Sequence, residues 1–516
     1  MASQHRRIDQ TPISRRNLGH LMLASGAVAA AGLTTSGQTI ARASGSGTPL
    51  PPEHTGEVYD PVESDFHARW TRAEARQLIT EQTNTKVSPG ENSLPKSLTM
   101  PDIPKDFPIM NDVVWVWDTW SLTDEYANQI SYKGWDVIFS LVAPRSIPFD
   151  ERHWSARIGY FFRRSDAEPT DKWTYGGHLF PGNTSVSNTE WSGSTRLIEG
   201  NTVRVFYTAT TFPPVRAGTE GKPSVIATVA GKLNVHDYGV TFSDFGQHET
   251  ILEPDGVMYQ TQEQNPGFAF RDPFTFEDPN DPGTCYMLFE GCGGGRPGDP
   301  ETLITKEDLG YRDDDPNAET VEEVNKMEAY RQRGNIGLAV ATNKELTKWK
   351  MLPPILTAYG TNDQTERPQM IIQKNNYYLF TISHQYTYAP GLRGPDGVYG
   401  FVGNGIRSDY RPMNGSGLVL ACPTDLNLPF ATAENPQPQQ NVRQFQAYSH
   451  YIQPGGLVQS FIDNVDGRRG GTLAPTVRIV YSGTTSYVDE TFGNNGLGDY
   501  GYLPTNRRLK NVLTIK

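Results

Sequence analysis

At 516 residues, the chain is long enough to form one large domain with extensions or several smaller domains. Charged residues make up only 20% of it, against 11% aromatic residues, 50 Gly and 38 Pro, a composition that favours short strands joined by tight turns over a helical bundle. The net charge of -12 argues against a nucleic-acid partner, because phosphate binding needs clustered Lys and Arg.

The N-terminus has the pattern of an export signal. Residues 14–18, SRRNL, carry a twin-arginine pattern, residues 21–33 form an apolar, Ala-rich run, and residues 41–43, ARA, offer a small-residue cleavage site. We therefore predict a twin-arginine signal peptide over residues 1–43 and a secreted protein, periplasmic or extracellular. A membrane anchor is less favoured, because this apolar run is too short to cross a bilayer comfortably and no later stretch is long enough.

An N-terminal leader and one helix are predicted next, over residues 44–100. Residues 44–63 are rich in Pro, Gly and Ser, which is typical of a flexible leader. In the segment TRAEARQLI, Thr71 and Glu74 have the spacing of a capping box, in which the hydroxyl and the carboxylate satisfy backbone amides at a helix start.

Beyond Asp102 the pattern changes to short runs of β-branched and aromatic residues, each bounded by Gly, Pro, Asn or Asp. The runs are WDVIFSLVA, ARIGYFFRR, TVRVFYTAT, TCYMLFEG, NIGLAVATN, YYLFTIS, GVYGFVGNG and TVRIVYSG. Serial short strands over some four hundred residues indicate an all-β sandwich, barrel or propeller. No strict repeat period is visible. We expect residues 101–516 to form a single domain.

The main exception to the strand pattern is an acidic insertion over residues 297–334. Within it, Thr320 and Glu323 form a second capping-box pattern. The apolar residues that follow have the spacing of one helical face; they are Val321, Val324, Met327 and Tyr330. We expect a surface helix packed against the β-body.

The three cysteines, Cys285, Cys292 and Cys422, are an odd count, so at least one thiol is unpaired within the chain. A short bridge between Cys285 and Cys292 stays open as an alternative. No Cys or His cluster has the spacing of a zinc site.

Three acids are set apart by their surroundings. Asp118 lies in VWDTW, Asp272 in FAFRDPF and Glu366 in DQTERPQM, each at the edge of an apolar run. Taken singly, such an acid more often caps a turn or pairs with a neighbouring Arg. Strand ends in a closed β-architecture converge on one face, however, and three acids meeting there would surround a pocket.

Two carboxyl groups in one pocket suit the cleavage of a glycosidic bond. Retaining cleavage needs a carboxylate nucleophile and a carboxylic acid roughly 5 Å apart. Apolar walls and a neighbouring acid would keep the proton donor protonated near neutral pH. Aromatic faces such as those of Trp117 and Trp191 would pack on sugar C–H surfaces. From the residues alone, the chain is a carbohydrate-active β-protein.

The same segments resemble the bacterial fructosyltransferases of glycoside hydrolase family 68, the levansucrases and inulosucrases, and most of all the levansucrases of Gram-negative bacteria. The resemblance covers the chain from about Trp70 and rests on several motifs in order: VWDTW, HWSARIGYFF, EWSGSTRL, FRDPF, DQTERPQ, FTISHQ and GPDGVYGFVGNGIRSDY. It implies an all-β fold, a five-bladed β-propeller with an axial active-site funnel and a few peripheral helices.

The resemblance also implies roles for the three acids. Asp118 matches the nucleophile, which attacks the anomeric carbon of the fructosyl unit and forms a covalent fructosyl-enzyme. Asp272 matches the acid that holds fructosyl hydroxyls and stabilises the transition state. Glu366 matches the general acid and base, which protonates the departing glucose and then deprotonates the acceptor.

Further substrate-binding residues are implied by the resemblance. The set is Trp117, Trp191, Ser192, Arg271, Gln364, Arg367, His384 and Tyr448. Gln364 and His384 stand where Gram-positive relatives carry Glu and Arg, as in the Gram-negative subgroup, and border the glucose and acceptor subsites.

For three of these residues, a role at the site and an ordinary structural role both stay open. Arg367 would orient Glu366 by pairing with a neighbouring carboxylate, or would form an ordinary surface ion pair. Tyr448 would border the pocket or be a core tyrosine, and His384 would contact substrate or be a hydrogen-bonded core histidine.

We predict no cofactor and no required metal. Gram-positive family members hold a structural calcium, but of such a ligand set only Asp363 can be matched, and one acid makes no calcium site. Asp363 is otherwise a turn acid beside the catalytic segment.

The resemblance, together with the export pattern, implies a secreted enzyme of the levansucrase type that transfers fructosyl units from sucrose to a β-2,6 fructan, to sucrose or to water. The expected partners are sucrose and fructan acceptors, with no nucleic acid, membrane or obligate protein partner. The alternatives are an inulosucrase, which makes β-2,1 links, a secreted invertase, and a sugar-binding propeller without catalysis.

Overall fold

A computed structural model describes residues 56–83, 95–168, 172–182, 184–211, 224–422 and 445–501. The predicted signal peptide lies outside the described residues. None of the helices in these ranges is long and apolar enough to span a membrane.

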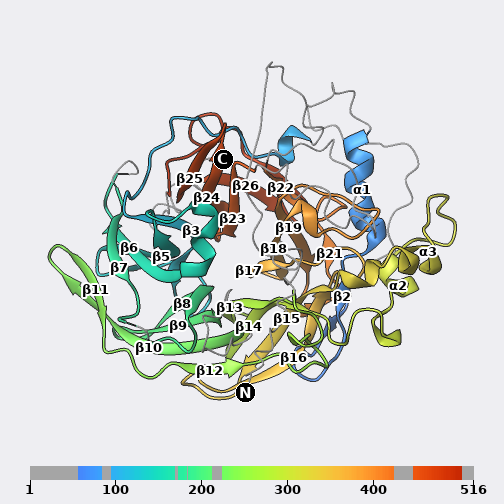
Figure 1. Cartoon of the computed structure of the whole chain (residues 1–516), viewed down its shortest axis with the longest axis horizontal. Helices are drawn as coiled ribbons and strands as arrows, with labels where there is room; N and C mark the ends of the chain where they lie inside the picture. The colour runs from blue at the N-terminus through green and yellow to red at the C-terminus, as the bar shows by residue number, and fades with distance from the viewer. Residues whose placement is uncertain are drawn as a thin grey trace, which may run out of the picture.

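Strands dominate the described chain and are arranged in sheets around a central axis (Figure 1). The largest sheet has ten strands, β3 (Val114–Thr123), β4 (Ser131–Tyr132), β5 (Trp135–Pro144), β6 (Arg157–Arg164), β7 (Thr174–His178), β8 (Thr189–Glu199), β9 (Thr202–Thr210), β10 (Val225–His236), β11 (Gly239–Ser243) and β12 (Glu249–Leu252).

Three further sheets have five strands each. The first contains β13 (Phe270–Asp278), β14 (Asp281–Cys292), β15 (Gly334–Ala341), β16 (Trp349–Thr357) and β2 (Ala68–Arg69). The second contains β17 (Glu366–Gln373), β18 (Asn376–Ser383), β19 (Gly397–Gly403), β21 (Arg411–Pro412) and β22 (Leu418–Ala421). The third contains β23 (Ala447–Ile452), β24 (Leu457–Val465), β25 (Arg468–Leu473), β26 (Val477–Ser482) and β27 (Thr485–Val488).

Most of the pairings between strands that are close in sequence are antiparallel, as between β13 and β14, β17 and β18, and β23 and β24, which suits short strands joined by tight turns. The ten-stranded sheet consists of two such runs that meet where β3 pairs parallel with β8. In Figure 1 the first strand of each run, β3, β8, β13, β17 or β23, lies nearest the central axis. The all-β propeller prediction is therefore confirmed. The number of five blades stays a prediction, because β3 and β8 join two of the runs into one sheet.

Within the described ranges, helices are few and peripheral. The α-helices are α1 (Arg72–Thr83), α2 (Lys306–Leu309) and α3 (Val321–Lys326), and the 3-10 turns are η1 (Lys96–Leu98), η2 (Phe149–Ser155), η3 (Pro300–Thr302), η4 (Ala329–Arg331) and η5 (Gln385–Thr387). The predicted capping box of α1 is confirmed, since the Thr71 amide donates to Glu74 at 2.8 Å and the Glu74 amide donates to the Thr71 hydroxyl at 3.3 Å.

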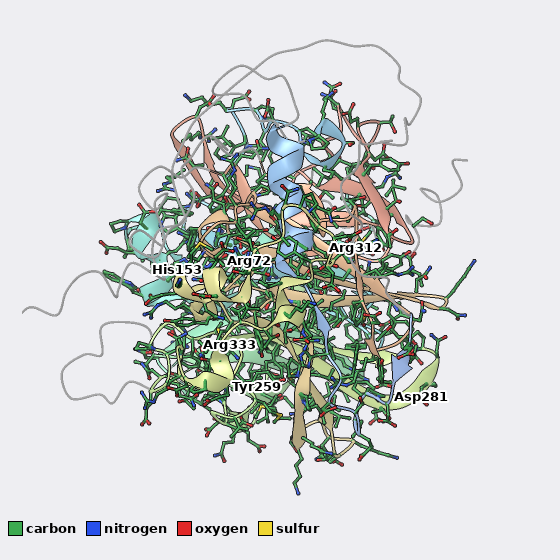
Figure 2. All side chains as sticks on the ribbon, turned by 90° about the vertical axis from the view of Figure 1, so that its right-hand side faces the viewer. Arg72, His153, Tyr259, Asp281, Arg312 and Arg333 are labelled. Atoms are coloured by element: carbon green, nitrogen blue, oxygen red, sulfur yellow. The ribbon has the colours of Figure 1, made fainter. Side chains whose placement is uncertain are left out.

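The N-terminal segment is tied to the propeller. Within the predicted leader, β1 (Val58–Tyr59) pairs with β20 (Arg407–Ser408). Arg72, labelled in Figure 2, lies at the start of α1 and donates to Glu319 at 2.8 Å and to the carbonyls of Gly360 and Pro390. These contacts join α1 to both the insertion and the sheet that carries β17.

The insertion over residues 297–334 differs from its prediction. The second capping box, Thr320 with Glu323, is present, but α3 ends after six residues because Glu328 adopts a left-handed conformation with φ 59°. The prediction of one helix that carries all four apolar residues is therefore wrong. Val324 is buried in a small apolar cluster, against which Met327 and Tyr330 pack, whereas Val321 is exposed.

All three cysteines are buried free thiols, so the alternative of a Cys285 to Cys292 bridge is wrong.

Candidate active site

A cavity of about 510 Å³ opens at the centre of the sheet arrangement. Each of the three catalytic candidates, Asp118, Asp272 and Glu366, lines it, although they come from β3, β13 and β17. The predicted substrate-binding residues line it too: Trp117, Trp191, Ser192, Arg271, Gln364, Arg367, His384 and Tyr448. The sheets thus bring together residues that are far apart in the sequence, such as Asp118 and Ser449, which are 331 positions apart.

The inner strands share one irregularity at the cavity. The pairing register of each shifts there, between Trp117 and Thr119 in β3, Trp191 and Gly193 in β8, Arg271 and Phe274 in β13, Glu366 and Gln369 in β17, and Tyr448 and Tyr451 in β23. Four residues in these bulges have positive φ, Asp118 at 43°, Asp272 at 62°, Arg367 at 47° and Ser449 at 53°. A bulge redirects a side chain, and strained non-Gly backbone gathers at functional sites.

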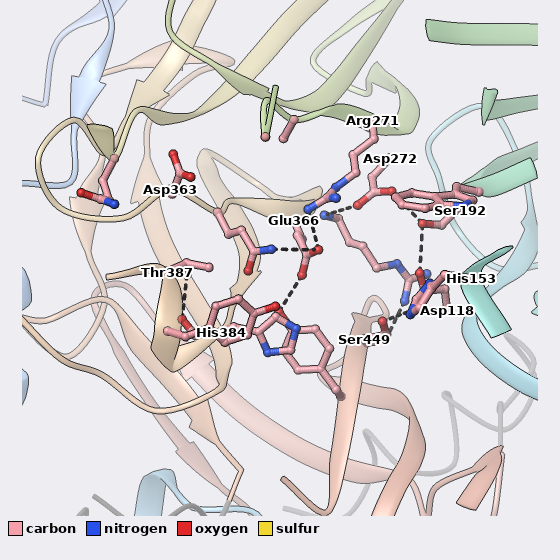
Figure 3. Close-up of a pocket in the computed structure, with 18 of the residues that line it drawn as sticks. Asp118, His153, Ser192, Arg271, Asp272, Asp363, Glu366, His384, Thr387 and Ser449 are labelled. Atoms are coloured by element: carbon pink, nitrogen blue, oxygen red, sulfur yellow. Dashed lines mark hydrogen bonds and ion pairs between the residues drawn. The ribbon is translucent and has the colours of Figure 1, made fainter. Parts of the chain in front are cut away.

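Asp118 is held by two hydroxyl groups. Ser192 donates to one carboxylate oxygen at 3.3 Å, and Ser449 donates to the other (Figure 3). Trp117 precedes it, with its indole N–H buried and bonded to no described residue. Both carboxylate oxygens are therefore fixed in direction while the group stays open to the cavity.

Asp272 is the most buried of the three acids. Ser192 donates to one of its oxygens at 2.7 Å, and the backbone amide of Arg367 donates to the other at 3.1 Å. Burial raises the pKa of Asp272 to about 6, with Arg271 opposing the shift and the charges of Glu366 and Asp118 adding to it.

Two side chains donate hydrogen bonds to Glu366, one to each carboxylate oxygen. The Arg271 guanidinium donates to one oxygen at 2.7 Å, and the Tyr448 hydroxyl donates to the other at 2.7 Å. Gln364 makes a longer contact of 3.5 Å. Arg271 also pairs with the fully buried Glu290 at 2.5 Å, and this arginine lies between two carboxylates. Burial raises the pKa of Glu290 above its usual value, and the positive charge of Arg271 offsets only part of this increase.

Two tryptophans form an apolar wall with His153 between them. The His153 ring centroid lies 5.5 Å from that of Trp117 and 5.9 Å from that of Trp191. Burial, with the nearby charge of Arg152, holds the pKa of His153 well below its usual range. This histidine is therefore neutral at ordinary pH.

Arg367 behaves in neither of the ways that the sequence predicts. It is buried, and its guanidinium donates to the carbonyls of Ser449 at 2.6 Å and Thr119 at 2.7 Å, so both the carboxylate pairing and the surface ion pair are wrong. The planar guanidinium of Arg367 carries several N–H donors, so it can donate to carbonyls of two different strands at once. Arg367 ties β17 to β23 and β3.

His384 and Tyr448 stack face to face, with ring centroids 3.8 Å apart and planes at 17°. Both are buried and both line the cavity, so Tyr448 is at once a buried tyrosine and a residue that borders the pocket, and His384 is a buried, hydrogen-bonded histidine at the cavity wall. Contact between His384 and substrate stays a prediction.

Asp363 also faces the cavity. One of its oxygens accepts the Arg333 amide at 3.1 Å, and burial raises its pKa to about 6. Among the residues that the structure describes, no group of three His, Cys, Asp or Glu side chains is placed to hold a metal ion.

Sequence reasoning assigned no role to several residues at the cavity. They include Arg152, His153, Ser449, Phe445 and Tyr386. His153 lies within the quoted segment HWSARIGYFF and Ser449 directly follows Tyr448, and an adjacent aromatic residue is the available signal in both cases.

Comparison with known proteins places the chain in a family. Residues 60–504 match the family model of glycoside hydrolase family 68, described as levansucrase/invertase. The chain therefore belongs to this family, and it is an enzyme of the family's fructosyltransferase class, as the motifs predict.

The relatives agree with this placement. The chain is 53% identical over 487 residues to a levansucrase of Gluconacetobacter diazotrophicus, covering 90% of this chain and 83% of the relative. It is 40% identical over 450 residues to an extracellular sucrase of Zymomonas mobilis, covering 85% and 96%.

Solved structures give the same result. The crystal structure of the Gluconacetobacter diazotrophicus levansucrase aligns with a TM-score of 0.82 at 52% identity, covering 89% of this chain and 97% of that one. The full-length β-fructofuranosidase of Microbacterium saccharophilum K-1 aligns with a TM-score of 0.82 at 48% identity, covering 89% and 90%.

Proposed function

We propose that the protein is a secreted levansucrase that transfers fructosyl units from sucrose to a growing β-2,6 fructan, to sucrose itself or to water. The observation that carries the proposal is the convergence of Asp118, Asp272 and Glu366 on one cavity, each with a different set of partners.

Asp118 acts as the nucleophile in this proposal. Hydroxyl groups donate to both of its oxygens, which fixes the direction in which it approaches the anomeric carbon. Asp118 forms a bond to that carbon as the glycosidic bond breaks, which leaves a covalent fructosyl-enzyme.

Glu366 acts twice. It first gives a proton to the departing glucose oxygen, and it then takes a proton from the acceptor that attacks the fructosyl-enzyme. Arg271 and Tyr448 hold the carboxyl group in place through both steps.

Asp272 stays with the fructosyl unit. Ser192 and the Arg367 amide each donate to one of its oxygens and fix its orientation, which suits a group that binds hydroxyls and stabilises positive charge in the transition state. Trp117 and Trp191 offer apolar faces to the sugar ring.

Export is part of the proposal. The twin-arginine pattern of residues 14–18 supports it, as does the similarity to a relative named as extracellular. Detection of the mature protein outside the cytoplasm, with loss of export on Arg15→Lys/Arg16→Lys, tests this part.

Incubation with sucrose, followed by measurement of glucose and fructose, tests the activity. Excess glucose over fructose means transfer, equal amounts mean hydrolysis alone, as in an invertase, and neither sugar means a binding protein. Linkage analysis of the polymer separates β-2,6 from β-2,1 products and hence a levansucrase from an inulosucrase. NMR of the fructose anomer first released in water tests double displacement, which predicts retention.

A further inference from the structure

His384 is paired with a buried acid that lies at the end of the neighbouring strand. His384 follows β18 and Asp396 precedes β19, and the pairing of Ser383 with Gly397 brings the two side chains together. The distance from His384 Nδ1 to Asp396 Oδ1 is 2.5 Å. The side chain of His384 is 5% exposed and that of Asp396 only 1% exposed.

This pairing decides which of the two imidazole nitrogens carries the hydrogen in the neutral ring. A carboxylate can only accept, so Nδ1 carries the hydrogen and Nε2 is left for another partner. Nε2 has no hydrogen-bond partner among the described residues, and His384 lines the cavity. In its neutral form the ring therefore presents an acceptor to a sugar hydroxyl there.

Aromatic rings on its faces fix the imidazole plane. The Tyr448 ring lies 3.8 Å from it at 17°, and the Tyr386 ring lies 4.8 Å from it at 19°. A half-turn of the ring would keep this stacking but would lose the bond to Asp396. Asp396 is thus the group that selects one of the two ring orientations.

The stack places His384 on the Glu366 side of the cavity. Tyr448 donates to Glu366, and in Figure 3 His384 lies near Glu366 while Ser192 and Asp118 lie across from it. In the proposed reaction, the departing glucose and the incoming acceptor occupy the Glu366 side.

We propose that Asp396 is a positioning residue which, through His384, sets how well a sugar acceptor competes with water for the fructosyl-enzyme. Asp396 contacts no substrate itself. A correctly oriented Nε2 binds a hydroxyl of the acceptor sugar, and water gains little from the same contact. This inference rests on the proposed function.

The test compares Asp396→Leu with Asp396→Asn, because Asn keeps an oxygen that accepts from Nδ1. For Asp396→Leu we expect the ratio of transfer to hydrolysis to fall at least fivefold and the KM for sucrose to rise, with kcat for glucose release within threefold of wild type. For Asp396→Asn we expect the ratio to stay within twofold. Asp278→Leu and Asp278→Asn are matched controls, since Asp278 is a buried acid that accepts from Tyr377 outside the cavity.

A double-mutant cycle separates positioning from structural support. In a His384→Ala background, adding Asp396→Leu leaves the transfer ratio unchanged if Asp396 acts through His384. A further fall in the ratio there, or an unchanged ratio in Asp396→Leu alone, overturns the inference. If Asp396→Leu does not fold, Asp396→Ser, which is too short to reach Nδ1, replaces it with the same expectations. A wild-type protein that releases no glucose from sucrose refutes the proposed function instead.

Discussion

At the scale of single residues, the site is a set of acids distinguished by their neighbours. Asp118 and Asp272 have the same side chain, yet hydroxyl donors surround the first while deep burial dominates the second. Environment, more than residue type, assigns the role of each.

Replacing Asp118, the proposed nucleophile, removes the first step of the proposed reaction. For Asp118→Asn we expect kcat to fall by about 10⁴-fold or more, because in the proposed mechanism no other group forms the covalent intermediate. Glucose release from sucrose measures the loss, with Asp278→Asn as a control for the removal of a buried charge. Near wild-type glucose release by Asp118→Asn, or by Glu366→Ala, would refute the assigned roles.

Asp272 carries a cost in stability that depends on pH. Its pKa of about 6 in the folded protein lies above its usual value of 3.8, so ionisation is harder in the folded state. The stability change is absent below about pH 4, where both states are protonated, and the folded state loses up to about 3 kcal/mol as pH rises through 4 to 6.

Asp272→Asn removes that cost, since its oxygen can face the Arg367 amide and its amide group can face Ser192. We expect this variant to gain stability relative to wild type between pH 4 and pH 7 while losing most of its turnover. Denaturant unfolding at the two pH values measures the gain. A stability difference that does not change with pH, or a normal turnover, would contradict the assignment.

At the scale of elements, the bulges of the inner strands aim side chains into the cavity. They depend on close backbone approach. A Cβ on Gly193 would lie 1.9 Å from the Phe206 carbonyl oxygen of β9, just beside Ser192 and Trp191. Glycine is needed there because the neighbouring strand leaves no space.

Gly193→Ala should therefore move β8 away from β9. We expect a loss of about 3 kcal/mol or more in the free energy of unfolding and at least a tenfold loss of kcat/KM, because Ser192 shifts with the strand. Gly246→Ala is the matched control, since a Cβ there meets only one atom, at 4.0 Å. Equal effects of the two substitutions on thermal unfolding would count against this account.

At the scale of the whole molecule, buried arginines link strands and segments that are far apart in the sequence. Arg367 bridges three inner strands, and the buried Arg407 donates to carbonyls of the N-terminal segment and of Pro353 and Pro354.

We expect chelation to leave the protein unchanged. After dialysis against EDTA, the melting temperature should stay within about 1 °C and sucrose cleavage within measurement error of the untreated protein. Added calcium is the control arm. A drop in melting temperature that calcium restores would show that a metal site exists and would refute the prediction.

Local sequence determined much of this protein. Runs of β-branched and aromatic residues between turn residues predict the strands, and the spacing of Thr71 with Glu74 predicts the start of α1. The flanking aromatic and Arg residues single out Asp118, Asp272 and Glu366. These features are readable because strand pleating, capping and turn formation depend on residues a few positions apart.

Tertiary structure alone decided the rest. The early end of α3, the carbonyl partners of Arg367, the second hydroxyl on Asp118 and the pairing of His384 with Asp396 depend on segments packed together in space. Ser449 lies 331 positions from the carboxylate it contacts, and no local pattern encodes such a distance. The sheets are arranged around one axis, so their inner strands and the bulges in them lie side by side. This arrangement determines which groups form hydrogen bonds with one another.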